Sequence, residues 1–384
     1  MNVNLDVFKN NINIVREKSG KGVEIIPVLK ADAYGHGLLE IARSAMECGC
    51  SRVAVSRVEE AVKLRESGIN NEIIILYYIS KEDIKKLFYY ELTPSISNRG
   101  ILEELIKYAS LKKKRIRAHI AIDTAGMSNL GINEQEYRDL QDVFWNNPYI
   151  TITGLFTHFV YAYSNCDSEF FKQKKIFDRC IKMIPLDKRA GVTVHAASSP
   201  AFLKYDDVEY DALRLATILY GIPIPHCILP PGIETVAEIK SVIADIKKVT
   251  SGKPIPGYCN SYLPSGDISI AVVPAGYGDF WWLNRACCNF VLVGNKRAQV
   301  IGTPYMDRML VDVTPIKNID IGDEVVLLGG QGNEKITIEE ICERCNIDIA
   351  SSETVVFPYS RVPRVFTHSY SSKVSQHILQ DLQL

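Results

Sequence analysis

The chain has 384 residues, of which 47% are hydrophobic, and its 44 lysines and arginines nearly balance its 45 aspartates and glutamates. This length exceeds one ordinary domain and fits either two domains or a barrel with an appended module. A formal net charge of -1 argues against a protein that works on nucleic acid or on an anionic membrane surface. Because we find neither a membrane-spanning apolar run nor a signal-peptide core at residues 1–6, we expect a cytoplasmic protein with reduced thiols.

Up to about residue 225, short β-branched apolar runs alternate with longer amphipathic stretches. Strands are predicted at 23–29, 52–56, 72–77, 93–97, 116–122, 150–156, 192–195 and 212–219, and helices at 38–48, 58–67, 81–89, 101–110, 134–145 and 169–184. Strands separated by helices indicate a parallel sheet, and eight of them suit a closed TIM-type (β/α)8 barrel. An open doubly wound sheet is the alternative.

From about Pro230 onward the pattern changes to short strands at close spacing, broken by Gly, Pro and Asn. These strands are predicted at 236–246, 269–273, 290–293, 298–301, 309–313 and 324–328. The Leu-Pro-Pro-Gly run that ends at Gly232 is the expected hinge. The sequence therefore predicts an α/β protein with a barrel at residues 1–228 and a C-terminal β-rich domain at residues 229–384.

Polar residues stand at the ends of several predicted barrel strands, which is where such barrels place their chemistry. They are Lys30, Asp123, the Thr157-His158 pair, His195 with Ser198-Ser199, and Arg214. Taken singly, a histidine at a strand end is more often structural, and an arginine usually pairs with a carboxylate. Lys30 directly follows an apolar strand, so we expect it at the barrel mouth, where burial lowers the pKa of its ammonium and frees a nucleophilic amine.

The segment 28–37 reads Val-Leu-Lys-Ala-Asp-Ala-Tyr-Gly-His-Gly and resembles the pyridoxal-phosphate signature of the alanine racemase family. The resemblance runs from Leu5 to Phe366, with further matches in family order at 123–131, 157–159, 195–199, 214–221, 276–279, 306–307 and 361–364. It implies a barrel that carries pyridoxal 5'-phosphate, a β-rich second domain, and a head-to-tail homodimer. In such dimers each active site borrows residues from the partner subunit.

The resemblance also implies a two-base racemisation of a small amino acid, either L- and D-alanine or a relative such as serine. Lys30 would hold the cofactor as a Schiff base and serve as one acid/base group. Tyr258 would be the second, because one base alone tends to return the proton to the face from which it came. Tyr277 and Met306 would line the substrate entrance from the partner subunit.

Five positions would hold the cofactor in place. Tyr34 and Ser199 would donate hydroxyls to its phosphate, assisted by backbone N–H groups near Thr217. Arg214 would face the pyridine nitrogen, which stays unprotonated because a guanidinium does not give up its proton. This weakens the cofactor as an electron sink and favours racemisation over side reactions. His158 would bridge Arg214 to the second base.

The family pattern breaks at positions that bear on the substrate. Asn129 stands where the family has an arginine that contacts the cofactor's phenolic oxygen and the substrate carboxylate, and Ala125 is an extra residue in the same loop. Ala121 replaces a carbamylated lysine that neutralises this arginine in many members. Asn129 can still donate a hydrogen bond to cofactor and substrate but carries no charge. The substrate carboxylate must therefore find another donor.

Two further departures concern the shape and polarity of the pocket. Ser198 replaces an asparagine, and Ser352 stands where the family usually has a tyrosine that touches the phosphate and crowds the substrate side chain. The smaller Ser352 leaves room and a polar wall. We therefore hypothesise that the substrate site admits side chains larger or more polar than methyl, serine being the simplest.

Three other interpretations are weighed against an active racemase, and the first is a racemase fold retained only for binding, which Asn129 leaves open. A decarboxylase of basic amino acids has the same layout but places an acidic residue at the pyridine nitrogen, which Arg214 contradicts. A non-catalytic pyridoxal-phosphate carrier built from the barrel alone needs no second domain with Tyr258 and Met306. Cys342-x-x-Cys345 has the spacing of a metal or redox site but lacks a second Cys or His pair nearby, so we expect no metal.

Overall fold

The computed structural model describes residues 1–124, 130–255, 262–285 and 290–368. The chain forms two compact units, one of Phe8–Glu234 and one of Met1–Val7 with the chain from Thr235 onward. The second unit includes strand β1 (Asn2–Asn4), which pairs antiparallel with β10 (Ala237–Val242) and parallel with β18 (Val365–Thr367). The sequence predicts that residues 1–7 belong to the barrel, because a three-residue strand carries no pattern that indicates a distant partner.

In the first unit, eight parallel strands follow one another around the sheet in chain order. They are β2 (Glu24–Pro27), β3 (Arg52–Val55), β4 (Glu72–Ile75), β5 (Thr93–Ile96), β6 (Ile116–Ala121), β7 (Ile150–Phe156), β8 (Thr193–His195) and β9 (Ala212–Leu215). Strands β2 and β9 are hydrogen-bonded, and a parallel bridge between Val28 and Ala54 joins the first strand to β3. The sheet is therefore closed, and the predicted (β/α)8 barrel is confirmed.

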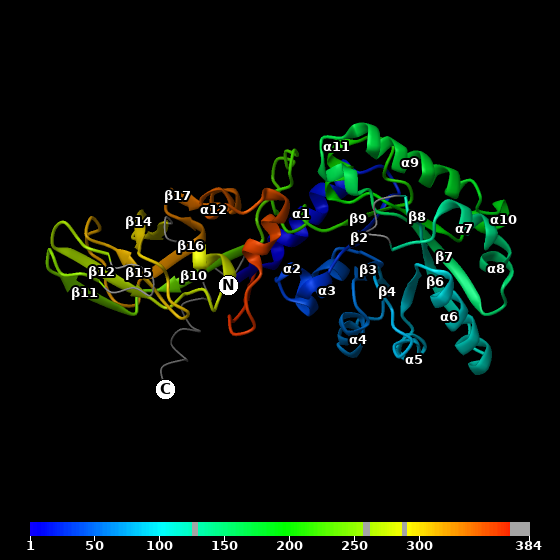
Figure 1. Ribbon diagram of the computed structural model, residues 1–384, viewed down its shortest axis with the longest axis horizontal. Helices are drawn as coiled ribbons and strands as arrows, with labels where there is room; N and C mark the ends of the chain where they lie inside the picture. The colour runs from blue at the N-terminus through cyan, green and yellow to red at the C-terminus, as the bar shows by residue number, and fades with distance from the viewer. Residues whose placement is uncertain (125–129, 256–261, 286–289, 369–384) are drawn as a thin grey trace. The chain divides into compact units, whose positions relative to one another are not determined.

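Helices surround the barrel strands (Figure 1). They are α1 (Leu5–Lys18), α2 (Lys30–Tyr34), α3 (Leu38–Glu47), α4 (Val58–Glu66), α5 (Ile84–Tyr89), α6 (Arg99–Lys112), α7 (Glu134–Asp139), α8 (Gln141–Asn146), the 3-10 helix η1 (Val160–Tyr163), α9 (Asp167–Ile181), α10 (Leu186–Arg189) and α11 (Ser199–Lys204). Asn98 and Asn133 cap α6 and α7, since each side-chain oxygen accepts the backbone N–H three residues on. The predicted helix at 134–145 is wrong in one respect, because Leu140 (φ -97°, ψ 5°) divides it in two.

The second unit is built around one mixed sheet in the order β11-β12-β15-β14-β13-β16-β10-β1-β18, with β17 paired to β16. Beyond the strands given above, its elements are β11 (Asp245–Val249), β12 (Ile268–Val273), η2 (Trp281–Arg285), β13 (Phe290–Val293), β14 (Lys296–Ile301), β15 (Met309–Asp312), β16 (Glu324–Gln331), β17 (Glu334–Ile336), α12 (Ile338–Cys345) and η3 (Ile349–Val356). The β-rich C-terminal fold is confirmed.

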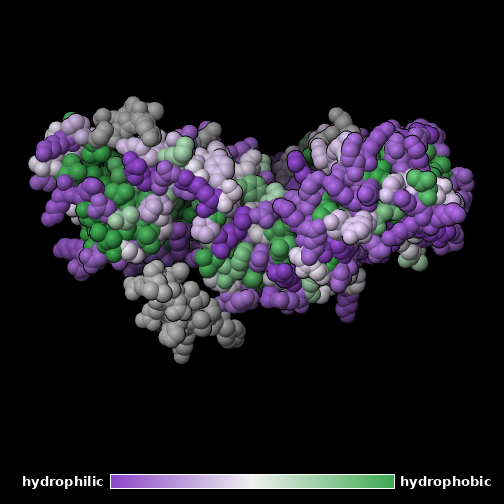
Figure 2. Space-filling model, turned by 90° about the horizontal axis from the view of Figure 1, so that it is seen from below, coloured by the Kyte–Doolittle hydropathy of each residue, from purple (hydrophilic) through white to green (hydrophobic). Residues whose placement is uncertain are grey.

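The surfaces of the two units differ in hydropathy on the face that Figure 2 shows. In the view of Figure 2 the barrel unit is largely hydrophilic, whereas the second unit presents a broader hydrophobic area. Several of its large apolar side chains are exposed, among them Leu263, Met306 and Tyr359. Searching the described helices for a long apolar segment finds none that would reach across a membrane.

Candidate active site

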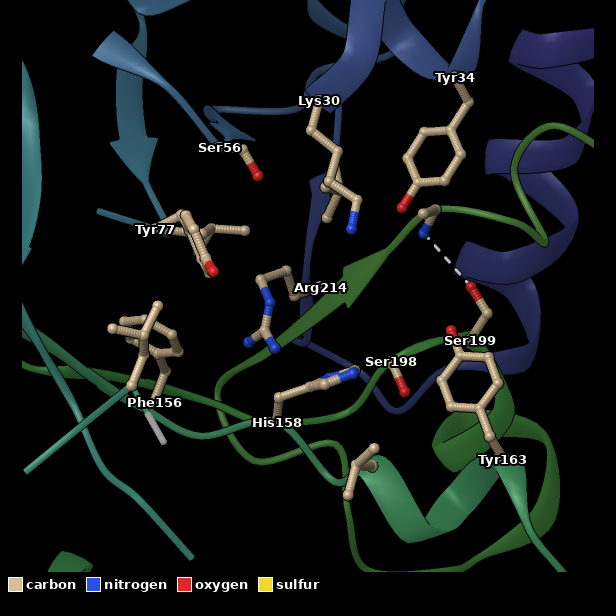
Figure 3. Close-up of a pocket in the computed structure, with 15 residues that line it drawn as sticks. Lys30, Tyr34, Ser56, Tyr77, Phe156, His158, Tyr163, Ser198, Ser199 and Arg214 are labelled. Atoms are coloured by element: carbon tan, nitrogen blue, oxygen red, sulfur yellow. Dashed lines mark hydrogen bonds between the residues drawn. The ribbon is translucent and has the colours of Figure 1, made fainter. Parts of the chain in front are cut away.

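A cavity of about 350 Å³ opens at the carboxyl ends of the barrel strands, a volume within the range of about 300–1,000 Å³ that is usual for small-molecule sites. Residues that directly follow five different strands line it (Figure 3). They include Lys30 after β2, Ser56 after β3, Tyr77 after β4, His158 after β7, and Ser198 and Ser199 after β8, while Arg214 comes from the end of β9. The strand-end residues from distant parts of the sequence thus share one site. Asp123 follows β6 but does not line the cavity.

Lys30 and Tyr34 lie at the two ends of an unusual turn. Ala31, Asp32, Ala33 and Tyr34 all have φ between 53° and 57°, so α2 is one turn of left-handed helix. Left-handed conformation costs about 1–2 kcal/mol for each L-residue and is rarely adopted by several in a row. The Ala31 N–H donates to the Glu60 carboxylate at 2.7 Å, and the Leu38 N–H donates to Asp32 Oδ1 at 2.9 Å, which helps to hold the turn.

This turn places both signature side chains at the cavity. The Lys30 Nζ lies 5.7 Å from the centre of the Tyr34 ring. Tyr34 is buried and packs against Tyr220, whose hydroxyl donates to the Val28 carbonyl at 3.1 Å. Lys30 is exposed rather than buried, so the expected burial of its ammonium is wrong for this chain taken alone.

Tyr34, Tyr163, Ser198 and Ser199 line one side of the cavity, and Thr217 directly follows the lining residue Ala216. We call these five hydroxyl-bearing residues the hydroxyl cluster. Figure 3 shows the first four of them pointing toward the same end of the cavity. The Ser199 Oγ accepts the N–H groups of Ala216 and Ile218 at 3.3 and 3.4 Å. The Ser198 Oγ and Thr217 Oγ1 are buried and have no hydrogen-bond partner within the described ranges.

Arg214 lies on the other side of the cavity, where hydrogen bonds to two barrel residues fix its guanidinium. It is 6% exposed, and it donates to His195 Nδ1 and to the Thr157 carbonyl, both at 3.0 Å. Its guanidinium carbon also lies 5.3 Å from the centre of the Phe156 ring. Burial lowers the pKa of Arg214 to about 10, which leaves it cationic at neutral pH.

His158 lines the cavity beside Arg214, but the imidazole bonded to Arg214 among the described residues is that of His195. The expected direct bridge from Arg214 to His158 is therefore not formed in this structure. Burial, and after it the charges of Arg214 and Lys30, lowers the pKa of His158 to about 3. His158 is consequently neutral at physiological pH and can accept or donate one hydrogen bond at each ring nitrogen.

Three hydroxyl-bearing cavity residues were missed by sequence reasoning, namely Ser56, Tyr77 and Tyr163. Barrels place their chemistry at strand ends, and the sequence prediction relied mainly on charged and imidazole side chains at those ends. Ser56 directly follows β3 and Tyr77 closely follows β4, so the same rule would have found both. Tyr163 ends η1, a short 3-10 helix whose place at the cavity depends on tertiary structure.

Thr217, Tyr277, Met306 and Ser352 are predicted site residues that are not among the residues lining this cavity. Asn129 and Tyr258 are outside the described residues, as is Ala125. Tyr277 and Met306 are neighbours in the second unit, where the Tyr277 and Gly278 N–H groups donate to the Tyr305 and Met306 carbonyls at 3.1 and 2.9 Å.

Ser352 is 1% exposed within η3 of that second unit. Cys342 and Cys345 are both buried on α12, and burial raises the pKa of Cys342 to about 11. No cluster of three or more His, Cys, Asp or Glu in the described parts of the chain is arranged to hold a metal ion.

The donor set of the cavity fits pyridoxal phosphate. Buried hydroxyls without a partner are rare in proteins, and those of Ser198 and Thr217 can donate to phosphate oxygens. Lys30 supplies an amine for an aldehyde, and Arg214 supplies N–H groups for a pyridine nitrogen. Phosphate, amine and nitrogen ligands are therefore arranged along a single cavity.

Comparison with known proteins agrees with this arrangement. The alanine racemase N-terminal and C-terminal domain families match residues 3–223 and 236–366. An alanine racemase of Carboxydothermus hydrogenoformans is 32% identical over 95% of this chain and 98% of that protein. The chain also resembles the solved alanine racemase of Clostridium difficile 630 (TM-score 0.85, 27% identity, 96% of this chain and 95% of that one).

A second solved structure is that of the Bacillus anthracis alanine racemase with bound L-Ala-P, which is 29% identical at a TM-score of 0.83 and covers 96% of this chain and 94% of its own. These matches confirm the family, the fold, the isomerase class and the cofactor that the sequence motifs indicated. The chain therefore belongs to the alanine racemase family, and it is a pyridoxal-phosphate-dependent amino-acid racemase.

Proposed function

We propose that the barrel cavity interconverts the L and D forms of alanine, or of a related small amino acid such as serine, with Lys30 and Tyr258 as the two acid/base groups. One observation carries the proposal: Lys30, Tyr34, His158, Ser199 and Arg214, which are far apart in the sequence, line one cavity at the carboxyl ends of the barrel strands. A decarboxylase of basic amino acids does not account for Arg214, and a carrier built from the barrel alone does not account for the second unit.

Pyridoxal phosphate, when bound, withdraws electrons from the substrate and so makes the proton on its α-carbon acidic. The Lys30 amine anchors the cofactor and moves that proton on one face of the substrate. The hydroxyl cluster binds the phosphate group and so fixes the cofactor along the cavity. Arg214 faces the pyridine nitrogen and keeps it unprotonated, since its guanidinium stays charged at neutral pH.

Inversion requires a proton to arrive on the opposite face, and we assign that step to the Tyr258 hydroxyl. Its support is the sequence motif alone, because Tyr258 lies outside the described residues. Tyr277 and Met306 then line the substrate entrance. This assignment places the second acid/base group on the second unit of a partner subunit.

Alanine is the first substrate to test, because the relatives that match over nearly the whole chain are named alanine racemases. Serine is the alternative, because Asn129 and Ser352 replace a charged and a bulky family residue. The Ser56 and Tyr77 hydroxyls line the cavity opposite the hydroxyl cluster, where they offer neutral donors to a substrate carboxylate. We propose that they take over part of the task of the missing arginine.

We also propose that the enzyme is a head-to-tail homodimer, since Tyr258 and Met306 belong to the unit that does not contain Lys30. The exposed apolar side chains of the second unit, which include Leu263 and Tyr359, are available for such an interface. A cytoplasmic location is proposed from the sequence alone. Sedimentation of the purified holoenzyme tests the dimer directly.

The activity is tested by incubating the holoenzyme with single enantiomers of alanine, serine and longer amino acids, followed by chiral chromatography. We expect inverted alanine or serine, and the ratio of the two rates gives the substrate preference. A strict preference for alanine would refute the serine hypothesis but not the racemase.

Amine plus carbon dioxide in place of inverted amino acid would indicate a decarboxylase, and no product from any substrate would contradict the proposed function. Tyr77→Phe tests the proposed carboxylate donor, because it removes one hydroxyl and keeps the ring. We expect it to raise the KM for the amino acid several-fold, as the loss of one neutral donor would, while the bound cofactor is retained.

A further inference from the structure

A chain of buried polar side chains leads from Arg214 through the interior of the barrel. The Arg214 guanidinium bonds to His195 Nδ1 at 3.0 Å, and His195 Nε2 bonds to His119 Nδ1, also at 3.0 Å. Both imidazoles are fully buried. Arg214, His195 and His119 stand on β9, β8 and β6, so the chain of contacts crosses the barrel rather than following its rim.

The donor inventory of these groups fixes the tautomer of both histidines. A guanidinium only donates, so His195 Nδ1 must accept, and the ring proton of neutral His195 is on Nε2. That N–H donates to His119 Nδ1, and the ring proton of His119 is therefore on its own Nε2. If either ring carried a second proton, two N–H groups would face each other in one of these two contacts, and that hydrogen bond would be lost.

Neighbouring residues fix the position of the His119 ring. It pairs with Gly154 of β7, and a Cβ at Gly154 would lie 2.4 Å from the His119 Cε1 and Nδ1 atoms. Any other residue at that position would push the ring aside. The strand register also shifts between Ala118 and His119, which sets the direction in which the ring points.

The far end of the chain is an anion. The Glu72 carboxylate interacts electrostatically with His119, and it is held by Arg52 Nε at 2.6 Å and by the Thr93 hydroxyl at 2.8 Å. The His119 Nε2 has no hydrogen-bond partner among the described residues, although it is buried. The Glu72 charge raises the pKa of His119, but burial outweighs it and keeps the ring neutral, as the bond to His195 requires.

We propose that His119 is a positioning residue, which acts through His195 to hold the Arg214 guanidinium in one orientation at the cavity. Thr157 fixes one nitrogen of the guanidinium and His195 another. With His195 itself fixed by His119, the plane of Arg214 is determined from inside the barrel. The inference rests on the proposed role of Arg214 toward the pyridine nitrogen, but the hydrogen-bond chain itself exists without the cofactor.

The tautomers are the direct test, because they do not depend on activity. The chain has seven histidines, so a 15N-histidine-labelled sample gives a spectrum that can be assigned by single replacements. In cofactor-free enzyme and holoenzyme at neutral pH, we expect His195 and His119 both to be neutral with the proton on Nε2. A proton on Nδ1 of either ring, or a charged ring, would overturn the proposal.

Kinetics of two variants then test the positioning role. His119→Phe keeps a ring beside Gly154 but removes the acceptor, so we expect kcat to fall about tenfold with KM changed less than about twofold, the cost of one buried unpaired N–H in the reaction. His119→Asn keeps an acceptor near the Nδ1 position and should recover most of kcat.

The control is His226→Gln, which changes an exposed histidine bonded to Asn165 and should alter neither the tautomers nor kcat. Unchanged kcat in His119→Phe, or equal losses in His119→Phe and His119→Asn, would show that His119 is merely structural. If the unmodified enzyme racemised no amino acid, the proposed function would fail while the tautomer result still decided the hydrogen-bond chain.

Discussion

The two sides of the barrel cavity are built in opposite ways. On the Arg214 side, the group that faces the cavity is bonded to His195 and Thr157, and His195 is bonded in turn to His119. On the side of the hydroxyl cluster, Ser198 and Thr217 carry buried hydroxyls that have no partner in the described part of the chain. The Arg214 guanidinium is thus hydrogen-bonded without a ligand, whereas these two hydroxyls are not.

The difference indicates what each side does. A buried polar group without a partner costs about 1–3 kcal/mol, so a protein keeps such groups where a ligand will satisfy them. The hydroxyl cluster therefore binds an incoming anion, whereas the Arg214 side presents a fixed donor against which the ligand is aligned. Lys30 lies between the two sides, at the end of the left-handed turn.

Removing the amine between the two sides should have the largest effect. Lys30→Arg keeps a positive charge but loses the nucleophilic amine, so we expect racemisation to fall by at least about 1,000-fold. Chiral chromatography of alanine measures it. Lys85→Arg on the exposed face of α5 is the matched control and should leave the rate unchanged. Racemisation within about tenfold of the original rate in Lys30→Arg would contradict the role of Lys30.

Acid should act on the Arg214 side, because the buried histidines His119 and His195 lie on that side. Burial lowers the pKa of His119 to about 4 and that of His195 well below its usual value. Since the unfolded chain takes up protons near pH 6.5 and the folded chain does not, the free energy of unfolding should fall from about pH 6.5 to about pH 4. The slope is at most about 1.4 kcal/mol per pH unit for each histidine.

Urea unfolding at several pH values in this range measures the slope. His119→Phe should make it shallower, because one such histidine is gone. Thr217→Val on the other side carries no titratable group and should leave it unchanged. Equal slopes in the original protein and in His119→Phe would show that His119 is not held neutral by the fold.

Two hydroxyl replacements should change stability in opposite directions. Thr217→Val removes a buried hydroxyl without a partner, so we expect the cofactor-free protein to gain about 1 kcal/mol. Ser199→Ala removes an acceptor that satisfies the Ala216 and Ile218 N–H groups, and should cost about 1 kcal/mol. Thermal unfolding of the cofactor-free proteins measures both. Both variants should bind pyridoxal phosphate more weakly, and a loss of stability in Thr217→Val would refute the account of the hydroxyl cluster.

The smallest expected effect concerns the turn that carries Lys30. Glycine adopts the φ of 53° found at Ala31 without strain, whereas alanine does not. Ala31→Gly should therefore raise the free energy of unfolding by about 0.5–1 kcal/mol, although glycine also adds flexibility to the unfolded chain. Ala190→Gly is the matched control, since Ala190 is exposed at an ordinary φ of -65°, and it should lower stability by a similar amount. Equal losses in both variants would mean that the turn is not strained.

The sequence was informative where local pattern decides structure. All eight barrel strands lie within their predicted ranges, because buried parallel strands read as short β-branched runs. The run 212–219 was predicted too long, since the chain leaves the sheet after Leu215 and forms the loop that bonds to Ser199. An apolar loop and an apolar strand look alike in sequence.

Features that depend on distant contacts were not predictable. The left-handed turn at Ala31 and Ala33 opposes the intrinsic preference of alanine and is held by groups such as Glu60. His119 drew no attention in the sequence, because its importance depends on Gly154 and His195 of other strands. The hydrogen bond from Arg214 to His195, where the sequence suggested His158, has the same cause. His158 follows β7 and His195 ends β8, so both histidines stand at strand ends.

The position of the cofactor on the chain is the most direct test of the whole account. Holoenzyme should be treated with borohydride, which makes the bond between pyridoxal phosphate and its lysine permanent, and then digested and analysed by mass spectrometry. We predict one pyridoxyl group for each chain, carried by the peptide that contains Lys30. A pyridoxyl group on any other lysine, or none on the Lys30 peptide, would contradict the assignment of the barrel cavity as the active site.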